Sequence, residues 1–210
     1  MLRTQTRSRG RLPSQCVEGG AFALVLGAAL IGCGDSAGAG IEPPKRRFEA
    51  VAAKTPSGDA LAGFCDVRAE PGQGKPFRLP PLEGGATLSA QGPVWVNLWA
   101  TWCKPCVEEM PMIGSWQKQL AGQGKKVDVR FVSVDETPEL VQTFRAQHPS
   151  LPASLRLAEP SALGPLVAEL GLDAGAGLPI HVFVESGSRV RCVRAGAITD
   201  SHYAIVSSLL

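Results

Sequence analysis

Two cysteines separated by two residues, Cys103 and Cys106, carry the strongest chemical signal in this 210-residue sequence. Such a pair can be half of a metal site, a structural crosslink, or a thiol pair that cycles between dithiol and disulfide. A structural zinc site needs four ligands, but there is one C-x-x-C here, and the three histidines, His148, His181 and His202, fall at no ligand spacing. A crosslink this short restricts the unfolded chain little. The redox interpretation is therefore favoured.

The elements on either side of the pair support this interpretation. Residues 94–100 are an apolar, β-forming run, as in a strand buried on both faces. Residues 104–121 follow a helical period, and Pro111 inside it is expected to kink the helix. Cys103 thus ends a strand and begins a helix. The helix dipole and the free backbone N–H groups favour a thiolate there, and the thiolate is the species that attacks disulfides.

The remaining chain predicts an α/β domain with a mixed sheet covered by helices. The composition, 44% hydrophobic and 19% charged, predicts a folded core. Residues 61–81 are expected to form an irregular lead-in that packs on this core. Further strands are expected at 126–134 and 155–157, helices at 137–147, 161–170 and 200–209, and a hairpin from 179–185 and 189–194.

The amino terminus is typical of a targeting segment. Four arginines precede an apolar run at residues 21–32. As a helix this run spans roughly 18 Å, well short of the ~30 Å hydrocarbon core, so it suits a signal peptide. Residues 30–33, LIGC, resemble the lipobox of bacterial lipoproteins, which implies that Cys33 is lipidated. An uncleaved signal anchor and ordinary cleavage near residues 37–39 are the alternatives.

These observations divide the chain into a signal peptide at 1–32, a Gly-, Ala-, Pro- and Ser-rich tether at 33–62, and a domain at 63–210. Without the signal segment, 17 basic and 18 acidic residues remain, because four arginines leave the 21 basic residues and Glu18 leaves the 19 acidic ones. This balance disfavours nucleic-acid binding. The basic run at residues 45–47 is interpreted as a solvated part of the tether.

The six cysteines are assigned in the same way. Cys16 leaves with the signal peptide and Cys33 carries lipid. In an exported protein disulfides persist, and with Cys103 paired to Cys106, Cys65 and Cys192 remain as a second bridge. We interpret that bridge as structural, with a second redox relay as the alternative.

The residues around the thiol pair resemble a known family. WATWCKPC, residues 99–106, resembles the active site of the thioredoxin superfamily. VNLWATWCKPCVEEMP, residues 96–111, resembles the membrane-anchored TlpA and ResA type of thiol–disulfide oxidoreductase, and the similarity continues at lower fidelity from about Phe64 to the end. The resemblance implies a thioredoxin-like fold, a central mixed β-sheet flanked by helices, and no metal or cofactor beyond the redox-active Cys103–Cys106 disulfide.

The resemblance also implies roles for single residues. Cys103 resembles the exposed nucleophile, Cys106 the resolving thiol, and Trp102 the aromatic platform beside them. Leu178–Pro179 resembles the family's cis-proline step, where a substrate strand can pair with the backbone of Leu178. The alternative is an ordinary trans proline at the start of a strand.

Charged residues near the pair could tune the thiols or accept their protons. Thioredoxins place a buried Asp six positions before the first cysteine, where this chain has Asn97, which cannot accept a proton from Cys106. The TlpA and ResA type implies Glu109 as the replacement, one helical turn from Cys106. A solvated carboxylate is the alternative for Glu109 and the favoured interpretation for Glu108. Lys104 adds a weak, screened positive charge.

The sequence therefore predicts a lipid-anchored thiol–disulfide oxidoreductase of the bacterial cell envelope, facing the periplasm. Family resemblance favours a reductant of protein disulfides, with apocytochrome c or copper-site thiols as targets and a membrane thiol donor that restores the dithiol. An oxidant or isomerase of the same fold is the nearest alternative, and a Cu(I)-binding module is the non-enzymatic one. A thiol peroxidase is disfavoured, since that family places threonine three positions before the cysteine and Thr101 lies two before.

Overall fold

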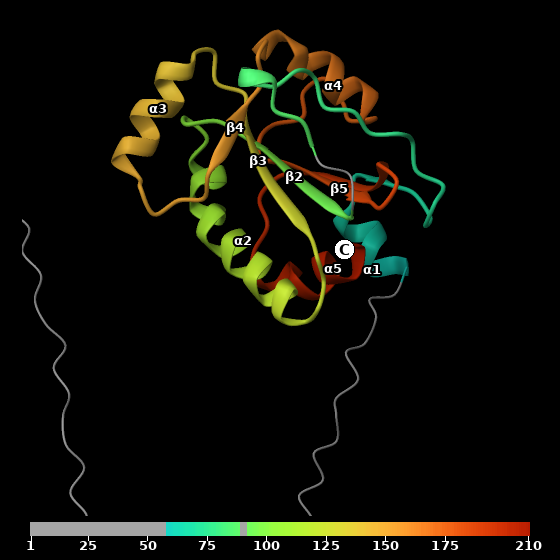
Figure 1. Ribbon diagram of the computed structural model, residues 1–210. Coiled ribbons are helices and arrows are strands. Elements are labelled where there is room, and N and C mark those ends of the chain that lie inside the picture. The colour runs from blue at the N-terminus through green and yellow to red at the C-terminus, as the bar shows by residue number, and fades with distance from the viewer. Residues whose placement is uncertain (1–57, 89–91) are drawn as a thin grey trace, which may run out of the picture. The chain divides into compact units, whose positions relative to one another are not determined.

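The computed structural model describes residues 58–88 and 92–210 (Figure 1). The predicted signal peptide, Cys16, the predicted lipidation site Cys33 and most of the predicted tether lie outside these residues. Within them the elements are α1 Gly58–Phe64, β1 Val67–Arg68, η1 Glu83–Gly85, β2 Val94–Trp99, α2 Lys104–Gly122, β3 Asp128–Ser133, α3 Pro138–Gln147, β4 Ser154–Arg156, η2 Pro160–Ala162, α4 Leu163–Glu169, β5 Ile180–Glu185, β6 Arg189–Ala195, η3 Asp200–His202 and α5 Tyr203–Leu209. None of the helices in this part of the chain has the length and apolar character needed to cross a bilayer.

One mixed sheet of six strands, in the order β1-β6-β5-β2-β3-β4, forms the centre of the domain (Figure 1). Strands β2, β3 and β4 are parallel, whereas β5 is antiparallel to β2 and β6 is antiparallel to both β5 and β1. All six residues of β2 are buried, which explains why its sequence is an apolar run rather than an alternating pattern. The predicted α/β class with a mixed, helix-covered sheet is confirmed.

Helices cover both faces of this sheet. On the face that carries Trp95, the Trp116 ring of α2 lies 6.2 Å from Trp95, and Tyr203 of α5 lies 5.3 Å from Trp116. Strand residues alternate between faces, and Val67 of β1 lies on the opposite face, close to Gly171 just beyond α4. Figure 1 shows α4 on the other side of the strands from α2 and α5. Helices α2 and α5 therefore share a face.

The predicted elements are present with shifted ends. The helices expected at 161–170 and 200–209 each begin with a 3-10 turn, η2 and η3, before α4 and α5. Helix α2 runs for 19 residues without a break at Pro111, which lies on its exposed side.

The lead-in, expected to be irregular at residues 61–81, contains α1 and the edge strand β1, neither of which was predicted. Helix α1 begins inside the segment assigned to the tether. Tertiary contacts stabilise it: Arg194 donates a 2.9 Å hydrogen bond to the Phe64 carbonyl, and Phe64 packs 5.9 Å from the Phe183 ring.

Candidate active site

Cys103 and Cys106 form a disulfide at the start of α2, with their Cα atoms 5.3 Å apart. Cys103 is the residue immediately before the helix, in extended conformation, and its N–H donates to the Ala100 carbonyl at 3.0 Å. Pro105 lies at the second helical position, where the N–H that it lacks would have no partner in the helix. The expected change from strand to helix at the first cysteine is confirmed.

The exposure of Cys103 differs from the expectation. The sequence predicts an exposed nucleophile, yet Cys103 is only 4% exposed in this disulfide form. Both cysteines belong to the core cluster of buried residues in this disulfide form. Trp102, immediately before Cys103, is 71% exposed.

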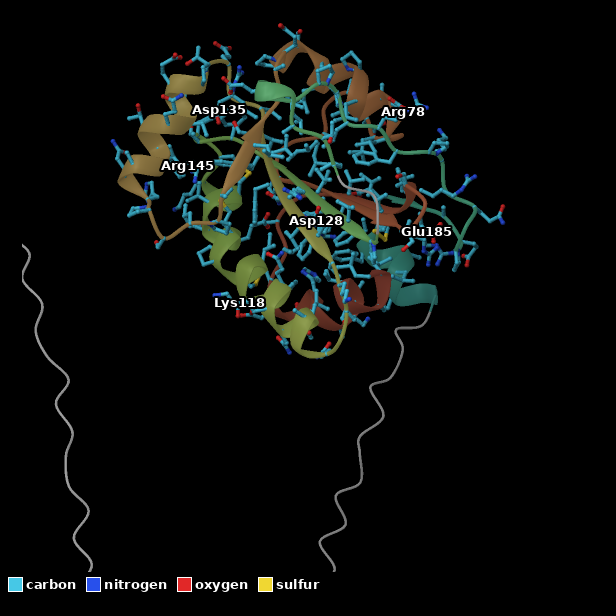
Figure 2. All side chains as sticks on the ribbon, viewed as in Figure 1. Arg78, Lys118, Asp128, Asp135, Arg145 and Glu185 are labelled. Carbon is cyan, nitrogen blue, oxygen red and sulfur yellow. A yellow bond between two sulfur atoms is a disulfide. The ribbon has the colours of Figure 1, made fainter. Side chains whose placement is uncertain are left out.

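A buried carboxylate that the sequence analysis missed, Asp135, anchors the loop before Cys103. It lies just beyond the carboxyl end of β3 (Figure 2) and accepts hydrogen bonds from the Thr101 N–H at 3.0 Å and the Thr101 hydroxyl at 2.7 Å. The Ser133 hydroxyl donates a third at 2.6 Å. Parallel strands present their carboxyl ends at one edge, so the position of Asp135 after a buried strand was the available signal. The Thr101 hydroxyl is thus engaged by Asp135, in keeping with the disfavoured peroxidase interpretation.

Glu109 is buried, so the solvated alternative for this residue is wrong. Its Oε1 accepts a 2.8 Å hydrogen bond from the Asn97 side-chain amide, and its Oε2 accepts a 2.9 Å hydrogen bond from the Ile198 N–H. Cys106 and Glu109 are both buried one turn apart on α2. This arrangement places the carboxylate on the same helix face as the resolving cysteine.

His181 of β5, which the sequence analysis named only as an unsuitable metal ligand, completes this buried group. Its Nε2 lies 3.3 Å from Glu109 Oε1, close enough for electrostatic contact but outside hydrogen-bond geometry. Within the described part of the chain, no cluster of His, Cys, Asp and Glu could hold a metal ion.

The peptide bond between Leu178 and Pro179 is cis, as predicted. Pro179 is buried and Leu178 half-buried at the start of β5. Their roles beside the sulfurs remain predictions.

The expected second bridge, Cys65–Cys192, is also confirmed, with a Cα separation of 5.5 Å. It joins the end of α1 to β6 across 127 residues of sequence.

The surface next to Cys103 carries apolar side chains. Trp102 and Leu140 are the large hydrophobic residues with high exposure among those the structure describes, and both line a shallow depression against α3 with Phe144. Glu139 lies at the edge of this depression. Its own backbone N–H, followed by the Thr137 side chain, lowers the pKa of the Glu139 carboxyl below its ordinary value.

Lys104 and Glu108 are exposed and form an ion pair at 3.6 Å, one turn apart on α2. The solvated interpretation of Glu108 is therefore confirmed. The Lys104 charge is paired with Glu108 and exposed to solvent, so it does little to stabilise a thiolate on Cys103 or Cys106.

Comparison with known proteins gives the family. A scan against models of protein families finds no match. Among curated proteins, the chain is 39% identical over 83 residues to the thioredoxin-like protein YneN of Bacillus subtilis and 33% identical over 76 residues to the thiol-disulfide oxidoreductase ResA of Bacillus cereus. These matches span 38% and 36% of this chain, and only 49% and 39% of the relatives' own lengths.

A longer match covers most of the folded domain. The chain is 33% identical over 146 residues to the thiol:disulfide interchange protein HelX of Rhodobacter capsulatus, a match that spans 67% of this chain and 72% of HelX. Among solved structures, a DsbF homologue from Corynebacterium diphtheriae has the same fold, with a TM-score of 0.53 at 18% identity over 69% of this chain and 92% of that one. The chain belongs to the thioredoxin-like family of thiol:disulfide interchange proteins.

Proposed function

We propose that this protein is a thiol–disulfide oxidoreductase that exchanges disulfides with protein substrates through Cys103 and Cys106. The observation that carries the proposal is the disulfide itself, formed between two cysteines at the first turn of a 19-residue helix. The helix N-terminus stabilises a thiolate there.

In the reducing direction the reaction has two steps. The Cys103 thiolate attacks one sulfur of a substrate disulfide, forms a mixed disulfide and releases the other substrate sulfur as a thiolate. Cys106 then loses its proton and attacks Cys103 Sγ, which releases the second substrate thiolate. Two electrons pass from the dithiol to the substrate, and the protein is left with the disulfide that the structure contains.

Glu109 is the group that can take the proton from Cys106 within the protein. It is buried on the same helix face one turn away, and its carboxylate oxygens accept hydrogen bonds from two neutral donors, Asn97 and the Ile198 N–H. Asn97 itself has no proton-accepting carboxylate. The protonated glutamate then returns the proton to a departing substrate thiolate or to water.

The depression beside Cys103 is proposed as the contact surface for the substrate polypeptide. Trp102 is adjacent to the reactive cysteine, and Leu140 extends the apolar area over α3. The predicted pairing of a substrate strand with the backbone of Leu178, beside the cis bond to Pro179, supplies a second contact.

The proposed location, lipid anchor and substrates of the protein are supported by its sequence. Lipid attachment at Cys33, a periplasm-facing position and a reducing role toward apocytochrome c or copper-site thiols are supported by the lipobox and by the resemblance to the membrane-anchored TlpA and ResA type. A membrane thiol donor would restore the dithiol after each turnover.

The decisive test replaces Cys106 with Ser and asks whether substrates are trapped on Cys103. Cell-envelope proteins should accumulate as mixed disulfides with Cys106→Ser and not with the Cys103→Ser control, and the wild-type protein should reduce insulin disulfides. Stoichiometric Cu(I) binding at the pair without insulin reduction would instead identify the copper-binding module.

The direction of electron flow is tested by the redox potential. A value near about −270 mV supports the reductant, and one near about −120 mV identifies an oxidant.

A further inference from the structure

A buried polar group built from β2, β5 and α2 includes Glu109, one turn from Cys106. Asn97 and His181 face each other across the antiparallel β2–β5 pair, and Glu109 of α2 packs on the same face. Trp95, two residues before Asn97 on the same face of β2, closes the group. Each of these four side chains is buried.

The partners of His181 determine which of its nitrogens carries the proton. The indole N–H of Trp95 donates to His181 Nδ1 at 3.3 Å, and an indole nitrogen can only donate. The Asn97 amide nitrogen also lies 3.3 Å from Nδ1. Nδ1 is therefore an unprotonated acceptor, and the proton of the neutral ring lies on Nε2, which faces Glu109.

Protonation of both ring nitrogens would oppose this arrangement. It would place a new N–H against two donors, those of Trp95 and Asn97, and would leave a charged ring in a site with no exposed surface. These contacts favour a ring with one proton, on Nε2, which lies 3.3 Å from Glu109 Oε1 but outside hydrogen-bond geometry.

The Glu109 carboxylate accepts two hydrogen bonds and has one further polar neighbour. Asn97 and the Ile198 N–H donate to its two oxygens, and the His181 N–H lies nearby at 3.3 Å. In the described residues no Lys or Arg forms an ion pair with it. The hydrogen-bond donors that contact the Glu109 carboxylate are therefore both neutral.

We propose that His181 is a positioning residue for the thiol chemistry: its neutral, Nε2-protonated ring acts on Glu109 Oε1 through an electrostatic contact at 3.3 Å and keeps Glu109 oriented as the carboxylate that takes the Cys106 proton. This inference rests on the proposed function. It assigns His181 to the second step, because the proton leaves Cys106 when that sulfur attacks Cys103 Sγ. Trp95 donates its indole N–H to His181 and not to Glu109, and this hydrogen bond fixes the tautomer of His181.

Two unpaired atoms are consistent with a group that changes state. Asn97 Oδ1 and His181 Nε2 are buried and make no hydrogen bond in the disulfide form. Buried polar groups are rarely left unpaired, and exceptions are found at redox and catalytic sites. When the disulfide is reduced, Cys106 gains an S–H donor and Glu109 can gain a proton, so the hydrogen bonds of this group can change.

His202 of η3 is a titratable group that is electrostatically coupled to His181. Burial lowers the pKa of His202 most, followed by the charge of Arg194 and, when it is protonated, His181. A His202→Gln variant therefore serves as the control that separates its titration from the response of the Glu109 group.

The test compares two amide substitutions of His181 that differ in reach. His181→Gln can place an N–H donor near the position of Nε2, toward Glu109. His181→Asn can place an acceptor near Nδ1, toward Trp95, but cannot reach Glu109. Reduced protein is mixed with the chromogenic disulfide 5,5′-dithiobis(2-nitrobenzoate), so that the first release of coloured thiolate reports attack by Cys103 and the second reports resolution by Cys106.

Across about pH 5 to 9, His181→Asn should slow the second release by about tenfold at neutral pH and shift its pH profile, leaving the first release unchanged. His181→Gln should recover most of the rate. Equal rates for the two variants, or slowing of both releases alike, would overturn the inference, because either result indicates a merely structural role. A wild-type protein that releases no second thiolate would instead contradict the proposed function.

A direct measurement keeps the inference testable if either variant fails to fold. Nitrogen-15 spectra of histidine-labelled wild-type protein should show His181 neutral at pH 7 with its proton on Nε2. Trp95→Phe, which removes the indole donor at nearly the same volume, should change that tautomer population. A His181 ring that is doubly protonated or protonated at Nδ1 would refute the assignment whatever the enzyme kinetics show.

Discussion

The Cys65–Cys192 bridge should stabilise the domain far more than the Cys103–Cys106 bridge, although both are disulfides. The first closes a segment with a sequence separation of 127 residues, and the second closes one with a separation of 3. A crosslink stabilises mainly by restricting the unfolded chain, so the longer segment gains more. The perturbation is the paired replacement Cys65→Ala with Cys192→Ala.

The expected size follows from these separations. The chain-entropy relation gives about 4.9 kcal/mol for a separation of 127 and about 1.6 kcal/mol for a separation of 3. Measured bridges commonly deliver less than this relation predicts, so we expect the Cys65/Cys192 replacement to cost about 3–5 kcal/mol. That is a large share of the roughly 5–15 kcal/mol by which domains are stable.

The assay is urea unfolding followed by tryptophan fluorescence, since Trp95, Trp99 and Trp116 are buried. The matched control is the paired Cys103→Ala and Cys106→Ala variant, which loses the same kind of bond over a short segment. Free energies should be compared rather than midpoints, because removing a crosslink expands the unfolded chain and changes the denaturant slope.

Two results would contradict the reasoning. A loss below about 1 kcal/mol for the Cys65/Cys192 pair, or a loss no larger than that of the Cys103/Cys106 pair, would show that loop closure does not govern the stability of this domain. A folded Cys65/Cys192 variant that no longer exchanges disulfides would favour the second redox relay. We expect its thiol exchange to match that of the wild type.

Three further predictions concern the site and its surroundings. Asp135→Asn should lower the free energy of unfolding by about 1–3 kcal/mol in urea titrations, because its amide would place a donor against the Thr101 N–H, whereas Thr101→Val should cost less. Trp102→Ala should raise the KM for insulin reduction by about tenfold, equivalent to 1.4 kcal/mol of contact, with an unchanged Tm, since the side chain is exposed. Burial and then the charge of Arg194 lower the pKa of folded His202 below the ordinary value of 6.5. As the pH falls through 6.5, His202 of the unfolded chain is protonated before His202 of the folded protein, so the free energy of unfolding should fall. His202→Gln should flatten the fall in urea midpoints between about pH 7 and pH 5.

The strands and long helices were predictable because their patterns are strong and continuous. β2 is a six-residue buried run, and α2 places buried residues at helical spacing. The short elements α1 and β1 were not predicted. The seven residues of α1 are too few for a stable isolated helix, and the adjacent bridge at Cys65 and the Arg194 contact to Phe64 support them; such tertiary contacts leave no local pattern in the sequence.

The residues of the candidate site also differ in how well the sequence predicted them. The cysteines, the cis peptide before Pro179 and Glu109 could be predicted because they lie close together in a motif or match a family pattern. Asp135 and His181 were missed, since they reach the site from the end of β3 and from β5 through pairing across the sheet, and only Asp135, which follows a buried strand, carried a sequence signal. For His181 the informative fact is its register opposite Asn97, which exists only once β2 and β5 have paired.

The two buried carboxylates have different consequences for the two thiols. Asp135 accepts donors from the loop before Cys103, and its charge is already engaged by Thr101 and Ser133. Glu109 lies one turn beyond Cys106 with its charge supported only by neutral donors. An anion on this side of the pair favours the protonated thiol on Cys106, whereas the helix N-terminus favours the thiolate on Cys103. In the proposed reaction the same helix therefore distinguishes its cysteines, with Cys103 attacking first and Cys106 attacking when Glu109 takes its proton.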